Sequence, residues 1–289
     1  MPLETEIKAG TICNNNCVFC LNHERDNIKP LAQIKSEIMC AKNAGITTIN
    51  FTGGEITIRE DFFEIIDFAN DNRLRTCIQT NGRIFNYEDF CDRILPKNVS
   101  LFLVSFHAHN EELNRKMTLV RRGYHQTKKG IVNLLHSKQN VQINVVVNKY
   151  NVDCLAEIAE HHLKLGVKNI QFSWVRPQGK AADNFEEIIP KYSENINKLI
   201  KAIKFLEEHD AKTVVLGVPF CLMGKYSKNC GNAYLDSRIV TNGSMIEANK
   251  LVEQRKITLR RCEKCNFKSC CGGFFKKYAE HYGETDFLD

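Results

Sequence analysis

The residues best suited to chemistry are three cysteines within eight positions, Cys13-Asn-Asn-Asn-Cys17-Val-Phe-Cys20, directly after a strand-like run. Thiolates spaced this closely can bind one face of an iron–sulfur cluster. A four-iron cubane with three local ligands keeps one iron open for a substrate or cosubstrate. The alternatives are a structural zinc site, which usually pairs CxxC with a second distant pair, and a set of redox thiols.

Other motifs lie at the ends of later strand-like runs, as the three cysteines do. The first is the turn Gly53-Gly54-Glu55, and the others are Gln79-Thr-Asn-Gly82, Val104-Ser105-Phe-His107 and Gln142-Ile-Asn-Val-Val-Val-Asn148. Together with the aromatic Phe19 before the last cysteine, they resemble the signatures of the radical S-adenosylmethionine (radical SAM) superfamily from about Glu6 to Pro177. Ile56 stands where that family usually has proline, which alters the stiffness of the turn and not its chemistry.

The resemblance implies that Cys13, Cys17 and Cys20 hold a [4Fe-4S] cluster. S-Adenosylmethionine would chelate the fourth iron and be cleaved to methionine and a 5′-deoxyadenosyl radical, which removes a hydrogen atom from the substrate. Glycines permit close backbone approach to the methionine moiety, and Glu55 can help to fix its ammonium group. The expected cosubstrate contacts are Phe19, Gly53, Gly54, Glu55, Asn81, Ser105, Asn144 and Phe172. For Phe19 and Phe172 an ordinary core position is the alternative.

Histidines and arginines after the fourth strand are candidates for handling the substrate. His107 and His109 suit substrate binding or proton transfer because histidine titrates near neutrality. The alternative is a hydrogen-bonded loop pair. Arg115, Arg121 and Arg122 can clamp an anion, although solvated surface charges explain them equally well.

The C-terminal tail carries a second metal signal, Cys262-Glu-Lys-Cys265 followed by Cys271, and resembles a SPASM/twitch extension after Pro219. We expect one auxiliary [4Fe-4S] cluster with Cys221 as its fourth ligand, Cys230 being the second choice. Cys270 can replace Cys271, but the glycines that follow favour Cys271. The turn expected around Gly243 has no cysteine close behind it, which argues against a full two-cluster SPASM domain. A zinc knuckle on the same thiols is the alternative.

Composition excludes several classes of protein. The chain has 289 residues, 43% of them hydrophobic, but no apolar run of 18 residues, so a membrane span is not expected. The N-terminal residues lack the pattern of a secretory signal, and thirteen cysteines without one indicate metal ligation in a reducing cytoplasm. The net charge of +6 fits an anionic substrate or RNA, but a solvated basic surface explains it as well.

Strand-like and helical runs alternate along the first 174 residues. Strands are expected at 6–12, 46–51, 74–79, 99–105, 141–147 and 167–174, and helices at 31–43, 61–70, 86–95, 127–137 and 152–165. Such repeated units predict an α/β fold with parallel strands, an open (β/α)6 partial barrel with its reactive groups at the carboxyl ends of the strands. We expect the barrel over 1–190, including a linker at 175–190. The cysteine-rich domain would cover 191–289 and begin with a helix at 191–209 and a strand at 213–218.

The leading hypothesis is an oxidoreductase-type radical SAM enzyme that acts on a small metabolite or a short peptide, helped by the auxiliary cluster. A flavodoxin- or ferredoxin-type protein would supply the electron. Only twelve residues precede Cys13, too few for a leader-peptide recognition domain, so a peptide maturase ranks second. RNA modification ranks lower because no RNA-binding module accompanies the slight basic excess. A noncatalytic iron–sulfur carrier is the alternative of another class.

Overall fold

A computed structural model describes residues 4–24, 26–231, 238–241, 244–247, 255–283 and 286. The expected turn at Gly243 lies outside these residues. None of the helices in the described part of the chain has the length and apolar character needed to cross a membrane.

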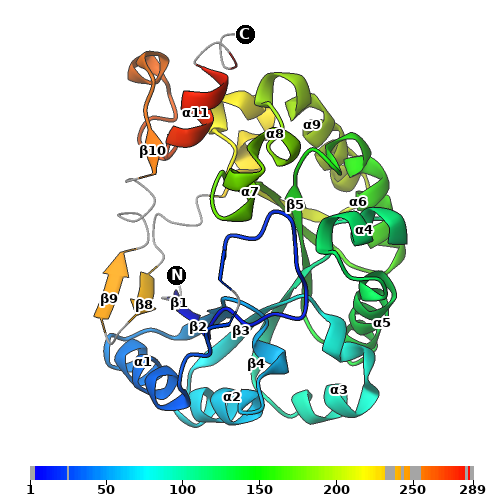
Figure 1. The fold of residues 1–289 in the computed structure, drawn as a ribbon, viewed down its shortest axis with the longest axis vertical. Helices are drawn as coiled ribbons and strands as arrows, with labels where there is room; N and C mark the ends of the chain where they lie inside the picture. The colour runs from blue at the N-terminus through cyan, green and yellow to red at the C-terminus, as the bar shows by residue number, and fades with distance from the viewer. Residues whose placement is uncertain are drawn as a thin grey trace.

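One twisted sheet forms the centre of the molecule (Figure 1). In the described residues its strand order is β7-β6-β5-β4-β3-β2-β1-β8-β9. Strands β1 to β7 pair in parallel, and their bounds are Glu4–Lys8, Thr48–Thr52, Arg75–Thr80, Val99–Ser105, Val141–Val147, Asn169–Trp174 and Lys212–Leu216. The parallel partial barrel expected from the sequence is therefore confirmed, and a seventh parallel strand extends it past residue 190. Strand β8 (Arg238–Thr241) pairs in parallel with β1, and β9 (Ser244–Glu247) returns antiparallel to β8.

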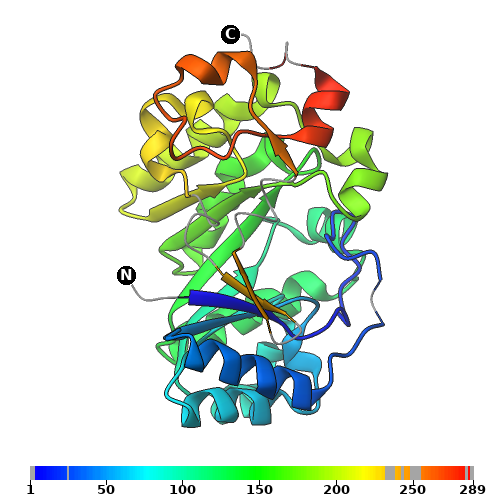
Figure 2. The same ribbon diagram turned by 90° about the vertical axis from the view of Figure 1, so that its left-hand side faces the viewer.

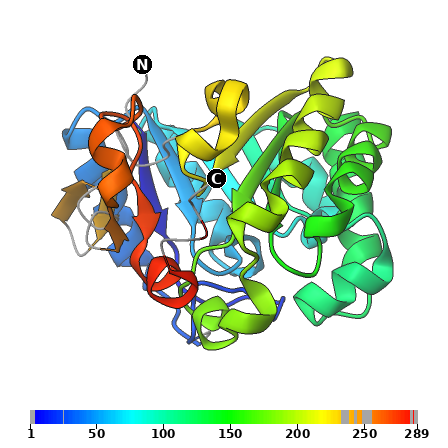
Figure 3. The ribbon, with the colours of Figure 1, turned by 90° about the horizontal axis from the view of Figure 1, so that it is seen from above.

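Helices cover the outer face of this sheet (Figures 1 and 3). Their bounds are α1 Leu31–Asn43, α2 Phe62–Asp71, α3 Glu88–Ile94, α5 Gly123–His136, α6 Leu155–Lys164 and α9 Tyr192–Glu208. Two expectations from the sequence were wrong in detail. No helix was expected between the strand at 99–105 and the helix at 127–137, but α4 (Glu111–Thr118) lies there. The expected linker at 175–190 contains α7 (Lys180–Asp183) and α8 (Phe185–Ile188). The first strand also begins and ends earlier than expected, because the chain leaves the sheet after Lys8.

The strands alternate between two environments because successive side chains point to opposite faces. On β5, Val141, Ile143, Val145 and Val147 are buried in the core beneath the helices, whereas Gln142 and Asn144 on the other face are partly exposed. The inner face of a full parallel barrel is usually packed with branched apolar residues. Here the inner face of β5 and β6 carries Gln142, Asn144, Gln171 and Ser173, so the side of the sheet away from the helices, here called the lumen, is partly lined by polar groups.

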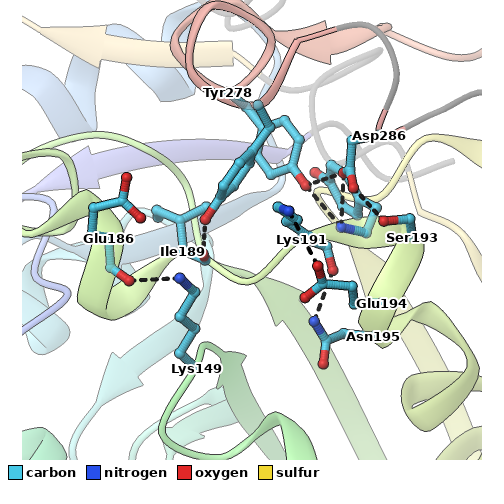
Figure 4. Close-up of polar contacts among 11 residues, drawn as sticks. Lys149, Glu186, Ile189, Lys191, Ser193, Glu194, Asn195, Tyr278 and Asp286 are labelled. Atoms are coloured by element: carbon cyan, nitrogen blue, oxygen red, sulfur yellow. Dashed lines mark hydrogen bonds and ion pairs between the residues drawn. The ribbon is translucent and has the colours of Figure 1, made fainter.

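The tail is held to the barrel through α11 (Lys276–Tyr282), which packs near the start of α9 (Figure 4). The Tyr278 hydroxyl donates to Oδ2 of Asp286 at 2.5 Å, and the backbone N–H of Tyr192 donates to the same oxygen at 3.1 Å. The hydroxyl of Ser193 donates to Oδ1 of Asp286. Burial, followed by the bond to Asp286, raises the pKa of the Tyr278 hydroxyl well above its ordinary value, so it stays a donor. This clasp joins the C-terminal segment to the barrel.

Candidate active site

The cysteine loop that follows β1 crosses the carboxyl end of the sheet, where it lies beside α4 and α7 (Figure 2). Its backbone is bonded to both elements. The N–H groups of Asn16 and Val18 donate to the carbonyls of Thr118 and Met117 at 2.9 and 3.0 Å, and the N–H of Lys180 donates to the carbonyl of Cys20 at 2.9 Å. The missed helix α4 therefore forms one wall of the site.

Side chains from the loop after β3 hold the middle of the cysteine loop. Arg83 donates from Nη1 to the carbonyl of Asn14 at 2.5 Å and to Oδ1 of Asn15 at 3.0 Å. Asn81 donates from Nδ2 to Oδ1 of Asn14 at 2.6 Å. Asn81, expected to contact the cosubstrate, thus anchors the cysteine loop. The role of Arg83 has no local signal in the sequence, since its partners lie almost seventy residues away.

Gly179 allows α7 to approach the last cysteine of the loop. A Cβ at this position would lie 2.4 Å from the carbonyl oxygen of Cys20 and 2.5 Å from that of Leu21, and the residue has a φ of +56°. Gly179 belongs to the segment Arg176-Pro-Gln-Gly179-Lys180, which was expected to lie in the linker at 175–190. The glycine itself was the sequence signal for this close approach, because a residue with positive φ is most often glycine.

The Gly-Gly-Glu turn packs directly against the segment that leads into Cys13. The N–H of Gly54 donates to the carbonyl of Gly10 at 2.8 Å, and the N–H of Glu55 donates to that of Ile12 at 2.7 Å. A Cβ on Gly53 would lie 2.3 Å from the Gly10 oxygen, and one on Gly54 would lie 2.0 Å from the Ile12 oxygen. The glycines are therefore required first for contact with the chain's own backbone.

Glu55 is buried and joins three segments of the site. Its Oε1 accepts from the Thr57 hydroxyl at 2.6 Å, the Thr80 hydroxyl at 2.8 Å and the Thr57 N–H at 3.2 Å, and its Oε2 accepts from the Asn81 N–H at 2.6 Å. Burial raises the pKa of Glu55 above its ordinary value, while the bond from Asn81 and those from the threonines oppose the rise. This carboxyl group fixes the ends of β2 and β3 beside the cysteine loop.

His107 is buried against Phe19, with the two ring centroids 5.1 Å apart in an edge-on arrangement. Its Nδ1 accepts from the N–H of Val146 at 3.0 Å, so the neutral ring carries its proton on Nε2. Burial lowers the pKa of His107 to about 4. The expectation that it titrates near neutrality is therefore wrong, and this ring is suited to donate a hydrogen bond rather than to shuttle protons.

Of the other candidates after β4, His109 is hydrogen-bonded within the protein and the three arginines lie at the surface. Tyr124 donates from its hydroxyl to the carbonyl of His109 at 2.9 Å, which ties the loop to α5. Arg115, Arg121 and Arg122 are exposed, as expected of solvated charges.

A row of polar side chains faces the lumen on β4, β5 and β6. Ser105 pairs with Asn144, and Asn144 pairs with Gln171, so all three share one face. Oδ1 of Asn144 accepts from Ser173 at 2.7 Å and from Gln171 at 3.1 Å. Phe172 lies between Gln171 and Ser173 in sequence, points to the opposite face and is fully buried in the core. Its expected role as a wall for adenine is corrected, since it does not face the lumen.

A cavity of about 440 Å³ lies beside the turn, lined by Gly10, Ile12, Ile28, Gly54 and Arg59 among others. Arg59 closes it from one side, donating to the carbonyl of Ala9 at 2.7 Å and to both oxygens of Asp61. Neither the polar lumen row nor His107 contributes to this cavity. It therefore adjoins the cysteine loop and is separate from the lumen.

The thiols fit the cluster expected from the sequence in their chemistry and their setting. Cys13, Cys17 and Cys20 are partly exposed on a loop whose backbone is held by two helices and the glycine turn. Sγ of Cys13 lies 3.4 Å from the N–H of Asn15, which suits an anionic thiolate. In the residues that the structure describes, no group of three or more His, Cys, Asp or Glu side chains is placed to hold one metal ion. A cluster differs from such a site because its thiolates bind different iron atoms.

Two segments that lie near each other carry the tail thiols. The 3₁₀ helix η4 (Phe220–Asn229) lies near the loop after η5 (Arg260–Lys264), with the rings of Phe220 and Phe267 6.0 Å apart. Burial raises the pKa of the Cys221 thiol, the Arg261 guanidinium opposes that rise, and Cys265, Cys271 and Cys262 add to it. Burial raises the pKa of Cys230 to about 12, with smaller effects from Cys271 and Cys221. Cys221 thus lies within the electrostatic reach of all three other expected ligands.

Comparison with known proteins gives a consistent result. The model of the radical SAM superfamily matches residues 7–162. A probable GTP 3′,8-cyclase of Saccharolobus islandicus is 31% identical over 192 residues, 64% of this chain and 61% of the cyclase. The mycofactocin maturase MftC of Mycolicibacterium smegmatis is 27% identical over 182 residues, 62% of this chain and 46% of the maturase. The chain therefore spans less than two thirds of the length of either relative.

Solved structures share the fold. Streptococcus suis SuiB bound to S-adenosylmethionine aligns with a TM-score of 0.71 at 14% identity, covering 97% of this chain and 74% of SuiB. The protein anSMEcpe with bound AdoMet aligns with a TM-score of 0.71 at 16% identity, covering 96% and 90%. At these identities the likeness concerns the fold alone.

Proposed function

Because the chain belongs to the radical SAM superfamily, whose members bind a [4Fe-4S] cluster and S-adenosylmethionine, we propose that it abstracts hydrogen from a small-metabolite or peptide substrate in a net oxidation. The observation that carries the proposal is the contact between two motifs. The segment entering the cysteine loop and the Gly-Gly-Glu turn are joined by two backbone hydrogen bonds of 2.8 and 2.7 Å. Residues more than forty positions apart thus form one site at the mouth of the barrel.

In this proposal each part of the chain has one task. Cys13, Cys17 and Cys20 hold the cluster, which when loaded supplies the electron that cleaves the cosubstrate to methionine and a 5′-deoxyadenosyl radical. The anchored loop and Glu55 keep the three thiols in place. The polar row around Ser105 and Asn144 contacts polar groups of the cosubstrate, and the ring of His107 packs edge-on against Phe19 of the cysteine loop.

The test is anaerobic reconstitution with iron and sulfide, followed by S-adenosylmethionine and dithionite. Wild-type protein is expected to form 5′-deoxyadenosine, and Cys17→Ala is expected to abolish it. Cys154→Ser is the matched control, because that partly exposed thiol lies at the start of α6. An intact cluster that produces no 5′-deoxyadenosine would favour an iron–sulfur carrier instead.

We further propose that the tail holds one auxiliary [4Fe-4S] cluster on Cys221, Cys262, Cys265 and Cys271. It would accept the electron left after hydrogen abstraction, which makes a net oxidation feasible. Support comes from the proximity of η4 to the tail loop and from the charges around Cys221.

Iron content tests the tail separately from the barrel. About eight irons per chain mean two cubanes, and about four irons with one zinc mean a zinc knuckle. Cys221→Ser is expected to lower the content by about four irons, and Cys230→Ser is expected to leave it unchanged. The reverse pattern would make Cys230 the fourth ligand.

A peptide substrate is the second form of the proposal. It is supported by the alignment of SuiB bound to its precursor peptide SuiA, at a TM-score of 0.68, and by the similarity to the mycofactocin maturase. In both forms a flavodoxin- or ferredoxin-type protein would reduce the first cluster. Consumption of a precursor peptide with formation of 5′-deoxyadenosine would separate this form from the small-metabolite form.

A further inference from the structure

The connection between α4 and α5 is fixed beside the cysteine loop, where α4 lies next to that loop (Figures 1 and 2). The carbonyl of Thr118, the last residue of α4, accepts from the N–H of Asn16 at 2.9 Å. In the first turn of α5, Oε1 of Gln126 accepts at 2.7 Å from Nε of Arg83, whose Nη1 donates to the carbonyl of Asn14. The connection is therefore tied to the cysteine loop at both ends.

Three arginines and one leucine are exposed here, and we call them the arginine surface: Arg115, Leu119, Arg121 and Arg122. Leu119 has an exposed fraction of 55% and ends α4 with a φ of +57°, which is uncommon for a leucine. Its N–H donates to the carbonyl of Arg115 at 2.9 Å. An apolar side chain is thus presented to water among three cations, on a hydrogen-bonded turn.

The positive charge of the arginine surface has no carboxylate to balance it. Within the part of the chain that the structure describes, none of the ion pairs includes one of the three arginines. The two carboxylates at the start of α4 pair elsewhere, Glu112 with Lys116 at 2.9 Å and Glu111 with His125 at 3.1 Å. The surface is therefore complementary to an acidic partner.

The shape and composition of the arginine surface suit a protein rather than a small anion or RNA. Small molecules bind in concave sites, and none of its four residues lines the cavity beside the Gly-Gly-Glu turn. Single-stranded RNA is usually bound by stacking its bases on aromatic rings, whereas the apolar residue here is a leucine. Arginines around an apolar contact are common in protein interfaces, and electron-transfer complexes need only a small one.

We propose that the arginine surface is the docking site for an acidic one-electron carrier protein of the flavodoxin or ferredoxin type. The inference rests on the proposed function, because it needs a cluster on Cys13, Cys17 and Cys20. Asn16, which is bonded to the end of α4, directly precedes Cys17, so a docked carrier lies against the loop that holds the cluster. One electron leaves the reduced flavin or iron–sulfur centre of the carrier and enters that cluster. The carrier is thereby oxidised, the cluster is reduced, and no atom is transferred.

The first test is calorimetric titration of the anaerobically reconstituted full chain with a bacterial flavodoxin and, separately, with a bacterial ferredoxin. Wild-type protein is expected to bind at least one of them saturably, and more weakly as chloride is added, because salt screens exposed charges. The triple variant Arg115→Gln/Arg121→Gln/Arg122→Gln is expected to bind at least about tenfold more weakly. Leu119→Asn keeps a residue that tolerates positive φ, and it is expected to weaken binding without changing the salt dependence.

The second test is formation of 5′-deoxyadenosine driven by the reduced carrier and, separately, by dithionite, a small reductant that needs no docking surface. The triple variant is expected to lose most of the carrier-driven rate and to keep the dithionite-driven rate. The matched control is Lys201→Gln/Lys204→Gln/Lys212→Gln, which removes the same charge from exposed positions of α9 and β7. It is expected to behave like wild type in both tests.

The inference is overturned if wild-type protein binds neither carrier saturably, if the triple variant binds like wild type, or if the control loses as much affinity as the triple variant. It is also overturned if the triple variant loses its dithionite-driven rate, or loses binding of a single-stranded RNA while it keeps binding of the carrier. If the triple variant fails to fold, Arg115→Glu on the exposed side of α4 decides, since it should weaken carrier binding. Absence of 5′-deoxyadenosine from wild-type protein with dithionite would instead refute the proposed function.

Discussion

Substitution Gly54→Ala tests the contact on which the site depends. A Cβ at Gly54 would lie 2.0 Å from the Ile12 oxygen and 2.6 Å from two carbonyl carbons, so the backbone must move by about 1 Å or more to reach any tolerated contact. Such a shift breaks the 2.8 and 2.7 Å hydrogen bonds between the two segments. Two lost bonds cost about 1–3 kcal/mol, and overpacking costs about 1–3 kcal/mol more.

The expected loss of about 2–6 kcal/mol is a large part of the free energy of unfolding of an ordinary domain. Ile12 also precedes Cys13, so the shift moves the first thiol beyond the tolerance of about 0.5 Å that a preorganised site requires. Anaerobic urea unfolding measures the first effect, and iron content with 5′-deoxyadenosine formation measures the second.

The control Gly45→Ala makes the same chemical change where a Cβ would meet nothing within 4 Å. Its φ of +75° should cost about 1–2 kcal/mol without changing the iron content. The reasoning is refuted if Gly54→Ala unfolds within about 0.5 kcal/mol of wild type and keeps its full complement of iron.

Three further predictions concern other parts of the site and the tail. His107 has a folded-state pKa of about 4 against about 6.5 when unfolded, so its contribution to stability is present above pH 6.5 and is lost as the pH falls toward 4. Between pH 7 and 5 the free energy of unfolding of the wild-type protein should fall by about 2 kcal/mol on account of His107. Urea unfolding should find this part of the fall absent in His107→Gln, and an equal fall in the wild type and the variant would contradict the prediction. Gly179→Ala should displace Cys20 and lower the iron content and 5′-deoxyadenosine formation, and full retention of both would show that the approach of α7 is dispensable. Asp286→Asn should weaken the clasp by about 2 kcal/mol and speed hydrogen exchange in α11, whereas unchanged exchange would mean that α11 docks without it.

Much of the fold could be predicted from the chain because local periodicity encodes which face of an element is buried. The helix at Leu31–Asn43 and the strands at Val99–Ser105 and Val141–Val147 were confirmed at both ends. The superfamily could be inferred from the cysteine motif and the glycine turn, since both are contiguous in sequence. Helix α4 was missed because its apolar residues are few and its surroundings are polar.

Contacts between distant segments were decided by the tertiary structure. Glu55 takes its partners from the end of β3, Arg83 reaches back to the cysteine loop, and Gly179 supports Cys20 from the far side of the barrel. The direction of Phe172 depended on strand register, since one position along a strand changes the face. Residue types and spacing thus determined which chemistry the chain is equipped for. Packing decided which groups meet, because a contact between remote positions has no periodicity that either segment could show alone.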